Sequence, residues 1–410
     1  MNYPATEPTR FDNLRVLIYS HDTFGLGHLR RCRAIAHELV GRYKGISVLI
    51  LSGSPVIGGF EFRARVDFVR IPGVIKLKDG RYTSLGLHID LDQTMAIREA
   101  IIRQTAEVFE PDLFIVDKEP LGLKGEVKET LRLLRDKGVK TVLGERDVID
   151  DSGALRQEWG LKAAVPALKD LYDEIWIYGT REFYDPFHGL GLESEIYDKT
   201  IFTGYLRRPP APDAAHIPEK PYVLVTPGGG KDGEEVVDLV FDCYRQTNKP
   251  DINAVFVLGP FMGEDSREAF KAKAESIDEF TVLDFHPRME SLIEHASGMV
   301  TMGGYNTFCE ILSFDQPAIV VPRYQPRMEQ LIRARRATEM GLIQMLEPDE
   351  FNVSGLLPKL REISAQPRPS SRMSSDMLSG MDVVCDRVVS LVTQKSASGS
   401  GPVLVHPQSN

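Results

Sequence analysis

Short apolar runs rich in β-branched residues alternate along the chain with longer stretches whose apolar residues recur at helical spacing. In one such stretch, 28–43, Cys32, Ile35 and Leu39 fall on one stripe, which predicts an amphipathic helix. The expected strands of the first half are 14–20, 46–52, 65–71, 112–118, 140–146 and 174–180. Because these strands are apolar on both faces and separated by helices, they favour a parallel sheet covered on both sides.

The pattern is interrupted once and then starts again. Residues 206–221 contain five prolines and show no periodicity, which is typical of a linker. Beyond it, the expected strands are 222–228, 252–259, 280–286, 298–304, 317–323 and 342–348. The expected helices include 28–43, 92–109, 121–137, 232–246, 264–277, 305–313, 326–340 and 374–393. The sequence therefore predicts an α/β fold of two doubly wound Rossmann-like domains that face a central cleft.

These elements give the expected domain boundaries. We predict a first domain, a proline-rich hinge, a second domain, a final helix that packs back toward the first domain, and a disordered tail. In that order, the five parts are 1–206, 207–221, 222–370, 371–395 and 396–410.

Composition and charge exclude several classes of protein. A formal net charge of −10 argues against a nucleic-acid binder, because phosphate backbones attract basic surfaces. The first residues lack the apolar core of a secretory signal, and no window has the roughly 18–20 apolar residues of a membrane-spanning helix. Four cysteines are scattered singly, as expected for buried residues in a reducing compartment. We therefore expect a cytoplasmic protein.

Three strand ends carry glycines directly before an expected helix. The segments are YSHDTFGLGHLRR, VTPGGGKDGEE and TMGGYNTFCEIL. Free amides at a helix start form a site for anions, and glycine lets a phosphate approach the backbone. None of the three is a dinucleotide fingerprint or a P-loop: Arg30 stands where GLGHLR would need its third glycine, and GGGKDGEE lacks the P-loop spacing. The pattern favours phosphate binding without favouring NAD(P) enzymes or nucleotide kinases.

With these residues the chain resembles the nucleotide-sugar glycosyltransferases of the glycosyltransferase-B fold. It is most similar to the branch that contains the peptidoglycan N-acetylglucosaminyl transferase, which makes lipid II. The resemblance is carried by residues 285–334, which follow the order of that family's donor site. In the first half it is confined to GLGH after the first strand and TGYLRR at the hinge.

The resemblance implies a donor site on the second domain. Phe285 and His286 would border the base of the nucleotide, and Glu310 would accept hydrogen bonds from the ribose hydroxyls. Glu329 and Gln330 would contact the hydroxyls of the sugar. The residues expected around the diphosphate are Gly27, Gly229, Gly230, Gly303, Gly304, Asn306 and Thr307.

The implied chemistry is displacement at the anomeric carbon with inversion. Arg208 would pair with the phosphates of the leaving group, and His28 is our candidate for the general base that deprotonates the acceptor hydroxyl. His28 could instead cap its helix or bind a phosphate, and His21 and Asp22 are nearby alternatives. We expect no metal and no cofactor, because no Asp-x-Asp motif lies at the end of an expected strand and no cluster of His, Cys and carboxylates has the spacing of metal ligands.

The acceptor side is less defined. Glu119, Arg146 and Asp147 end two strands of the first domain and are the candidates for acceptor contacts. The resemblance implies a nucleoside-diphosphate sugar donor, UDP-linked and carrying a hexose or N-acetylhexosamine. The acceptor could be a sugar, a lipid-linked molecule or a small molecule, with a peripheral contact at the inner face of the membrane and a place in cell-envelope or polysaccharide synthesis. The oligomeric state stays open.

Two other functions fit the same residues. An enzyme similar to UDP-N-acetylglucosamine 2-epimerase would share the donor site and need no acceptor. A non-catalytic protein that binds a nucleotide sugar would keep the second domain's site while the first domain diverges.

Overall fold

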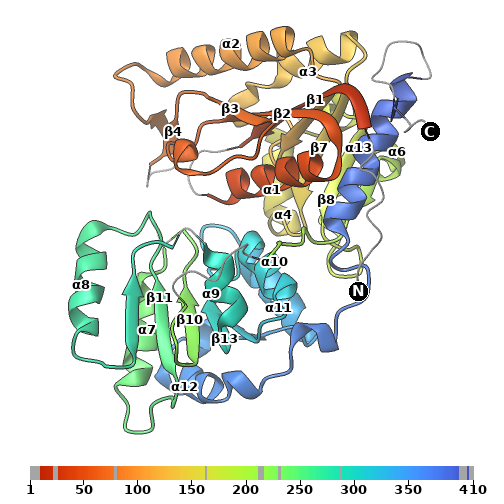
Figure 1. Cartoon of the computed structure of the whole chain (residues 1–410). Helices are drawn as coiled ribbons and strands as arrows, with labels where there is room; N and C mark the ends of the chain where they lie inside the picture. Colours follow the sequence, from red (N-terminus) through yellow and green to blue (C-terminus); the bar gives the residue numbers. More distant parts are fainter. Residues whose placement is uncertain are drawn as a thin grey trace, which may run out of the picture.

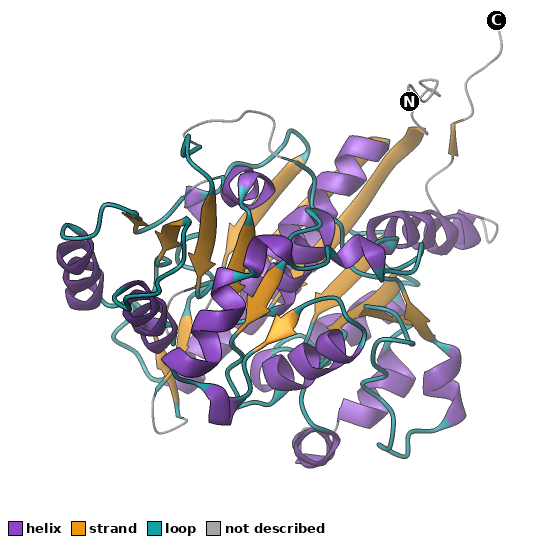
Figure 2. Ribbon diagram, turned by 90° about the horizontal axis from the view of Figure 1, so that it is seen from below, coloured by secondary structure: helices purple, strands orange, loops and turns teal. Residues whose placement is uncertain are grey.

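The computed structural model describes the chain as two α/β domains stacked on each other, the first above the second in Figure 1. The described residues are 10–21, 26–77, 81–161, 164–210, 217–229, 232–286, 288–396 and 404–405. In Figure 2 the strands run side by side between layers of helices. The predicted fold class, two doubly wound domains, is confirmed.

The first domain is built on a parallel sheet with the strand order β3-β2-β1-β6-β7-β8-β9. Its strands are β1 (Arg10–Ser20), β2 (Lys44–Ser52), β3 (Val66–Arg70), β6 (Leu113–Asp117), β7 (Lys140–Arg146), β8 (Glu174–Tyr178) and β9 (Thr200–Phe202). The order reverses between β1 and β6. At such a reversal the connecting segments leave toward opposite faces, which opens a crevice at the carboxyl ends of the strands.

Helices cover both faces of this sheet. They are α1 (Gly27–Arg42), α2 (Leu91–Phe109), α3 (Lys128–Asp136), α4 (Ser152–Leu161), α5 (Ala164–Leu171) and α6 (Ser194–Asp198). The apolar stripe predicted on 28–43 is buried in the core, since Cys32, Ile35 and Leu39 are at most 1% exposed. Helix α2 begins where the carboxylate of Asp90 accepts a hydrogen bond from the amide of Gln93.

The second domain repeats the plan with the strand order β12-β11-β10-β13-β14-β15, again parallel. Its strands are β10 (Tyr222–Thr226), β11 (Asn253–Val257), β12 (Phe280–Leu283), β13 (Gly298–Thr301), β14 (Ala318–Val320) and β15 (Gln344–Met345). Its helices are α7 (Glu234–Tyr244), α8 (Glu264–Ala274), α9 (Met289–His295), α10 (Tyr305–Ser313), α11 (Glu329–Glu339) and α12 (Val353–Arg361). Here the order reverses between β10 and β13.

The chain returns to the first domain at its end. Helix α13 (Gly380–Ser396) packs against α1 and β6, and Figure 1 shows it in blue beside the first sheet. Arg387 pairs with Glu174 of β8, and Arg42 of α1 pairs with Asp382 at 2.6 Å. The two domains are therefore linked both by the hinge and by the segment before α13.

Some elements differ from the expectation. Leu404–Val405 form β16, which pairs antiparallel with Arg10 and Phe11, so this part of the tail predicted as disordered is ordered. The cause is backbone pairing: β1 begins at Arg10, earlier than expected, and offers its first residues to a short apolar segment. A hairpin of β4 (Val74–Lys76) and β5 (Tyr82–Ser84) was also not expected.

Candidate active site

The site lies where the two reversals of strand order face each other. Helix α1 follows β1 in the first domain, and α10 follows β13 in the second; the two helices are in contact (Figure 1). The side-chain amide of Asn306 donates a hydrogen bond to the carbonyl of Gly27 at 2.9 Å. Two of the three glycine segments, far apart in the sequence, therefore meet across the domain interface.

The start of α10 has the geometry of an anion site. Gly303 has a φ of 70°, and Gly304 precedes the first helical residue. A Cβ at Gly304 would meet no heavy atom within 4 Å, so the space in front of the helix is open. The first amides of a helix have no partner within it, and the helix dipole is positive there. Helix α10 contacts α1, and Asn306 in its first turn bonds to Gly27, so this helix start lies at the domain interface.

The two glycines allow separate tests of folding and binding. We expect Gly303→Ala to destabilise the fold by at least about 1–2 kcal/mol, because an L-residue at positive φ is strained and its Cβ would lie 2.5 Å from Cγ1 of Val320. Gly304→Ala should leave stability nearly unchanged yet weaken nucleotide binding about tenfold, because a methyl group would enter the open space. Urea denaturation and calorimetry with UDP would measure the two effects. If Gly303→Ala and Gly304→Ala lowered the free energy of unfolding equally, Gly304 would not be the open position proposed for ligand binding.

The third glycine segment lies beside the α10 junction, because β10 pairs with β13 at Thr226 and Thr301. Gly228 has a φ of 73°, and the carbonyl of Gly229 accepts a hydrogen bond from the amide of Phe261 at 3.0 Å. Gly230 lies outside the described residues, as does Asp22 near the first segment.

Three further donor-site candidates have hydrogen-bond partners or exposure that bear on their predicted roles. Phe285 is 51% exposed after β12, where its ring is accessible to a base. The Nδ1 atom of His286 accepts a hydrogen bond from the amide of Arg288, at the start of α9. Thr307 is buried in the first turn of α10. Their roles toward a nucleotide stay predictions.

The carboxylates expected near the sugar and ribose are already paired. Glu310 accepts a hydrogen bond from Nη2 of Arg30 at 2.5 Å, across the interface. Glu329 pairs with Arg146 of β7 at 2.6 Å, which helps lower the pKa of Glu329 to about 2 although burial acts in the opposite direction. The side-chain oxygen of Gln330 accepts a hydrogen bond from the amide of a loop residue after β14 at 3.0 Å.

Arg208 lies where the hinge meets α10. It is buried, and its Nη2 atom donates to the side-chain oxygen of Asn306 at 2.7 Å. Its Nε atom is buried and has no hydrogen-bond partner among the described residues. A buried donor without a partner is costly unless a ligand satisfies it.

His28 forms a dyad with a carboxylate that the sequence did not identify as its partner. Its Nδ1 atom lies 2.5 Å from Oδ2 of Asp117, at the end of β6. Arg31 holds the same carboxylate with two hydrogen bonds of 2.7 and 2.8 Å. Because a carboxylate accepts hydrogen bonds only, the proton of the imidazole is on Nδ1, and Nε2 is left as the basic atom.

The surroundings of His28 and Asp117 keep the imidazole neutral, which is the form that a general base requires. Burial lowers the pKa of His28 to about 4, although Asp117 opposes the shift, so the imidazole is neutral near pH 7. Burial would raise the pKa of Asp117, but Arg31 and His28 outweigh it and bring that pKa to about 2. The ring of His21 lies 5.8 Å from that of His28, on the side of β1.

The acceptor-side candidates Asp147, Glu119 and Arg146 are all buried or paired. Asp147 is fully buried and binds Arg333 of α11 at 2.7 Å, and it also accepts a hydrogen bond from Tyr205 at 2.8 Å. It is thus part of the domain interface, and its acceptor contact stays a prediction. Glu119 is buried next to β6, and Arg146 pairs with the second domain as described above; their acceptor contacts stay predictions.

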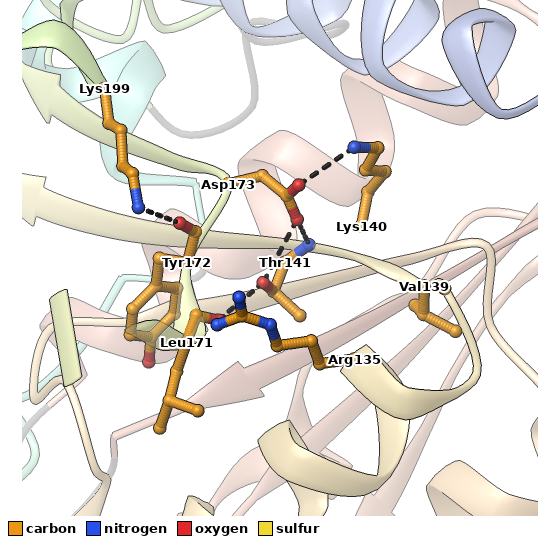
Figure 3. A pocket seen from close by; sticks show the side chains of 9 residues that line it. Arg135, Val139, Lys140, Thr141, Leu171, Tyr172, Asp173 and Lys199 are labelled. Carbon is orange, nitrogen blue, oxygen red and sulfur yellow. Dashed lines mark hydrogen bonds and ion pairs between the residues drawn. The ribbon is translucent and has the colours of Figure 1, made fainter. Parts of the chain in front are cut away.

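A separate pocket of about 290 Å³ lies at the opposite edge of the first sheet (Figure 3). It is lined by Lys140, Asp173 and Lys199 among others, near the amino ends of β7 and β8. Lys140 and Asp173 pair with each other at 2.9 Å. This pocket is remote from the carboxyl ends of the strands, where ligands of such sheets bind.

Comparisons with known proteins agree with this geometry. Residues 222–388 match the model of the Glycosyltransferase family 28 C-terminal domain. Over its whole length the chain is similar to the solved glycotransferase of kitacinnamycin, with a TM-score of 0.61, 16% identity, and 95% of this chain and 100% of that chain covered. MurG of Acinetobacter baumannii gives a TM-score of 0.58, with 14% identity over 92% of this chain and 99% of that chain. The chain has the glycosyltransferase-B fold.

One curated relative is also similar to this chain in amino-acid sequence. It is the UDP-N-acetylglucosamine–N-acetylmuramyl-(pentapeptide) pyrophosphoryl-undecaprenol N-acetylglucosamine transferase of Thermosipho africanus, 25% identical over 154 residues. The match spans 37% of this chain and 42% of the relative, less than half of either. The resemblance predicted from the sequence is confirmed for this glycosyltransferase-B protein, most directly in its second domain.

Metal-ligand clusters and membrane-spanning helices were looked for in the described residues. Within them, no group of three or more His, Cys, Asp or Glu side chains is arranged to hold a metal ion. In the same part of the chain, no helix is both long and apolar enough to cross a membrane.

Proposed function

We propose that the protein is an inverting, metal-independent glycosyltransferase. It would move a hexose or N-acetylhexosamine from a nucleoside-diphosphate sugar, UDP-linked, to an acceptor hydroxyl. The observation that supports this most is the start of α10, where the space at Gly304 is open and Asn306 bonds to the carbonyl of Gly27, the residue before His28 of the His28–Asp117 dyad. The relative from Thermosipho africanus, whose name includes UDP-N-acetylglucosamine, supports the choice of donor.

The donor would lie along α10. Its diphosphate would accept hydrogen bonds from the first amides of the helix, where the dipole contributes about 0.3–1 kcal/mol. That is too little to stabilise a departing diphosphate, so a cation must add to it. The unpartnered Nε of Arg208 supplies such a donor from the hinge side, and aimed donors contribute about 3–4 kcal/mol each to a transition state. The ribose would lie farther along the helix, toward Glu310.

The transfer step needs one proton acceptor and one leaving group. Nε2 of His28 takes the proton of the acceptor hydroxyl while the oxygen attacks the anomeric carbon from the face opposite the diphosphate. The bond between that carbon and the phosphate oxygen breaks, and the nucleoside diphosphate leaves with the electron pair. Asp117 keeps the imidazole oriented and stabilises the imidazolium that forms. The acceptor would enter from the first domain, as a sugar, a lipid-linked molecule or a small molecule.

A binding panel tests the donor half of this proposal. Nucleoside diphosphates and their sugars are added separately, and the melting temperature is measured. A ligand at 100 times its Kd stabilises by about 2.7 kcal/mol, so we expect a clear shift with UDP or a UDP-sugar and little with adenine nucleotides. No shift with any nucleoside diphosphate would overturn the proposal.

The reaction itself is tested with the selected donor. Incubation with a panel of hydroxyl acceptors should release the nucleoside diphosphate only when an acceptor is present. Epimerisation of the donor without acceptor would instead support an epimerase, and tight binding without turnover would support a binding protein.

A further inference from the structure

Both carboxylates expected to bind donor hydroxyls are paired with arginines from the opposite domain. Arg30 holds Glu310 at 2.5 Å, and Arg146 holds Glu329 at 2.6 Å. The side chains of the carboxylates are only 4% and 9% exposed, whereas that of Arg30 is 26% exposed. A nucleotide that uses Glu310 must therefore compete with an existing ion pair.

Arg30 differs from its neighbours on α1 in how firmly it is held. Arg31 is 1% exposed and fixed by two hydrogen bonds to Asp117. Arg33 donates to the carbonyl of Glu61 within the first domain. Arg30 is 26% exposed, and its second acidic neighbour after Glu310 is Glu290 of α9, 3.7 Å away. Of these three arginines, Arg30 makes its ion pairs with the second domain.

Charge decides what kind of ligand can break this pair. Ribose hydroxyls can satisfy Glu310 by donating hydrogen bonds, but they leave the Arg30 guanidinium with only its longer contact to Glu290, in a partly desolvated place. A ligand that also carries an anion replaces the lost partner. The start of α10 lies on the same helix as Glu310, so a diphosphate bound there would lie along the helix that Arg30 already contacts. Guanidinium groups bind phosphates through two parallel hydrogen bonds.

We propose that Arg30 exchanges Glu310 for the diphosphate of the donor and so makes the cleft selective for nucleoside diphosphates over nucleosides. This rests on the proposed function, and it assigns a specificity-determining role to a residue of the first domain. Binding of the ribose releases Arg30, and Arg30 then fixes the phosphates. The two events are coupled, because either one alone leaves Glu310 or Arg30 without its closest partner.

The test compares two ligands on two proteins. Calorimetry measures the Kd of UDP and of uridine for the wild type and for Arg30→Ala. We expect Arg30→Ala to bind UDP about tenfold more weakly, because the diphosphate loses a charged partner, and to bind uridine about tenfold more tightly, because Glu310 is free. The decisive result is that the Kd of UDP rises while the Kd of uridine falls. If Arg30→Ala raises both Kd values, lowers both, or changes neither, the proposed role of Arg30 is wrong.

Controls separate this role from a loss of folding and from the proposed function. Arg33→Ala removes an arginine from the same helix and should leave both Kd values as in the wild type. Arg30→Lys keeps the charge and should restore most of the preference for UDP. Glu310→Gln releases Arg30, so it should bind inorganic pyrophosphate more tightly than the wild type does. A wild type that binds neither UDP nor any other nucleoside diphosphate contradicts the proposed function itself.

Discussion

His28→Ala is expected to reduce transfer about 10²–10⁴-fold while the Kd of the nucleotide stays unchanged. The reason is geometric: His28 turns Nδ1 toward Asp117 at 2.5 Å and leaves Nε2 as the basic atom, so the substitution removes the proton acceptor but no donor of the α10 start. Initial rates of nucleotide release, with binding measured in parallel by calorimetry, test this. Activity close to that of the wild type would exclude His28 as the base.

The pH profile gives an independent check of the same residue. A base acts in its deprotonated form, and the pKa of His28 is lowered from 6.5 to about 4 by burial. We therefore expect kcat/KM to hold as the pH falls through 6.5 and to decrease only toward pH 4. Asp117→Asn should lower the rate nearly as far as His28→Ala, since the imidazole loses the group that fixes its tautomer. An acid limb centred near pH 6.5 would contradict the buried dyad.

Much of the fold follows from local patterns in the sequence. All twelve strands expected in the two domains are present, because strands buried on both faces are nearly continuous apolar runs. Helices α1, α2, α7, α8, α10 and α13 begin or end close to the predicted positions. Among the elements not named in advance, the strands of the β4–β5 hairpin and β9 are three residues long and give no periodic signal. Helices α4, α5 and α12 were also not named in advance.

The candidate site was only partly predictable, because its decisive contacts join residues far apart in the chain. His28 and Asp117 are 89 positions apart, and Arg30 and Glu310 are 280 apart. The glycines and the strand ends mark the cleft, since the carboxyl ends of parallel strands share one edge. Which arginine meets which carboxylate depends on how the domains are stacked. Asp147 is an example. Its position after β7 predicted a residue of the cleft, but in the structure it forms an ion pair with Arg333 across the domain interface.

The ion pair between Asp147 and Arg333 is expected to dominate the stability of the domain interface. The two side chains are at most 1% exposed, and Arg333 also donates to the carbonyl of Gly303 at 3.3 Å. Removing one partner of a buried pair leaves an uncompensated charge, so Arg333→Ala should lower the free energy of unfolding by about 3–5 kcal/mol. Urea denaturation followed by circular dichroism measures this loss.

A matched control lies on the same helix. Arg335 pairs with Glu347 at 2.9 Å but is 51% exposed, so Arg335→Ala should cost about 1 kcal/mol or less. The double variant Asp147→Leu with Arg333→Met should be more stable than either single variant, because it removes both buried charges together. It should still bind UDP more weakly than the wild type does, since the carbonyl of Gly303 has lost its donor and the turn before α10 is held less firmly. Equal costs for Arg333→Ala and Arg335→Ala would show that the buried pair does not hold the domains together.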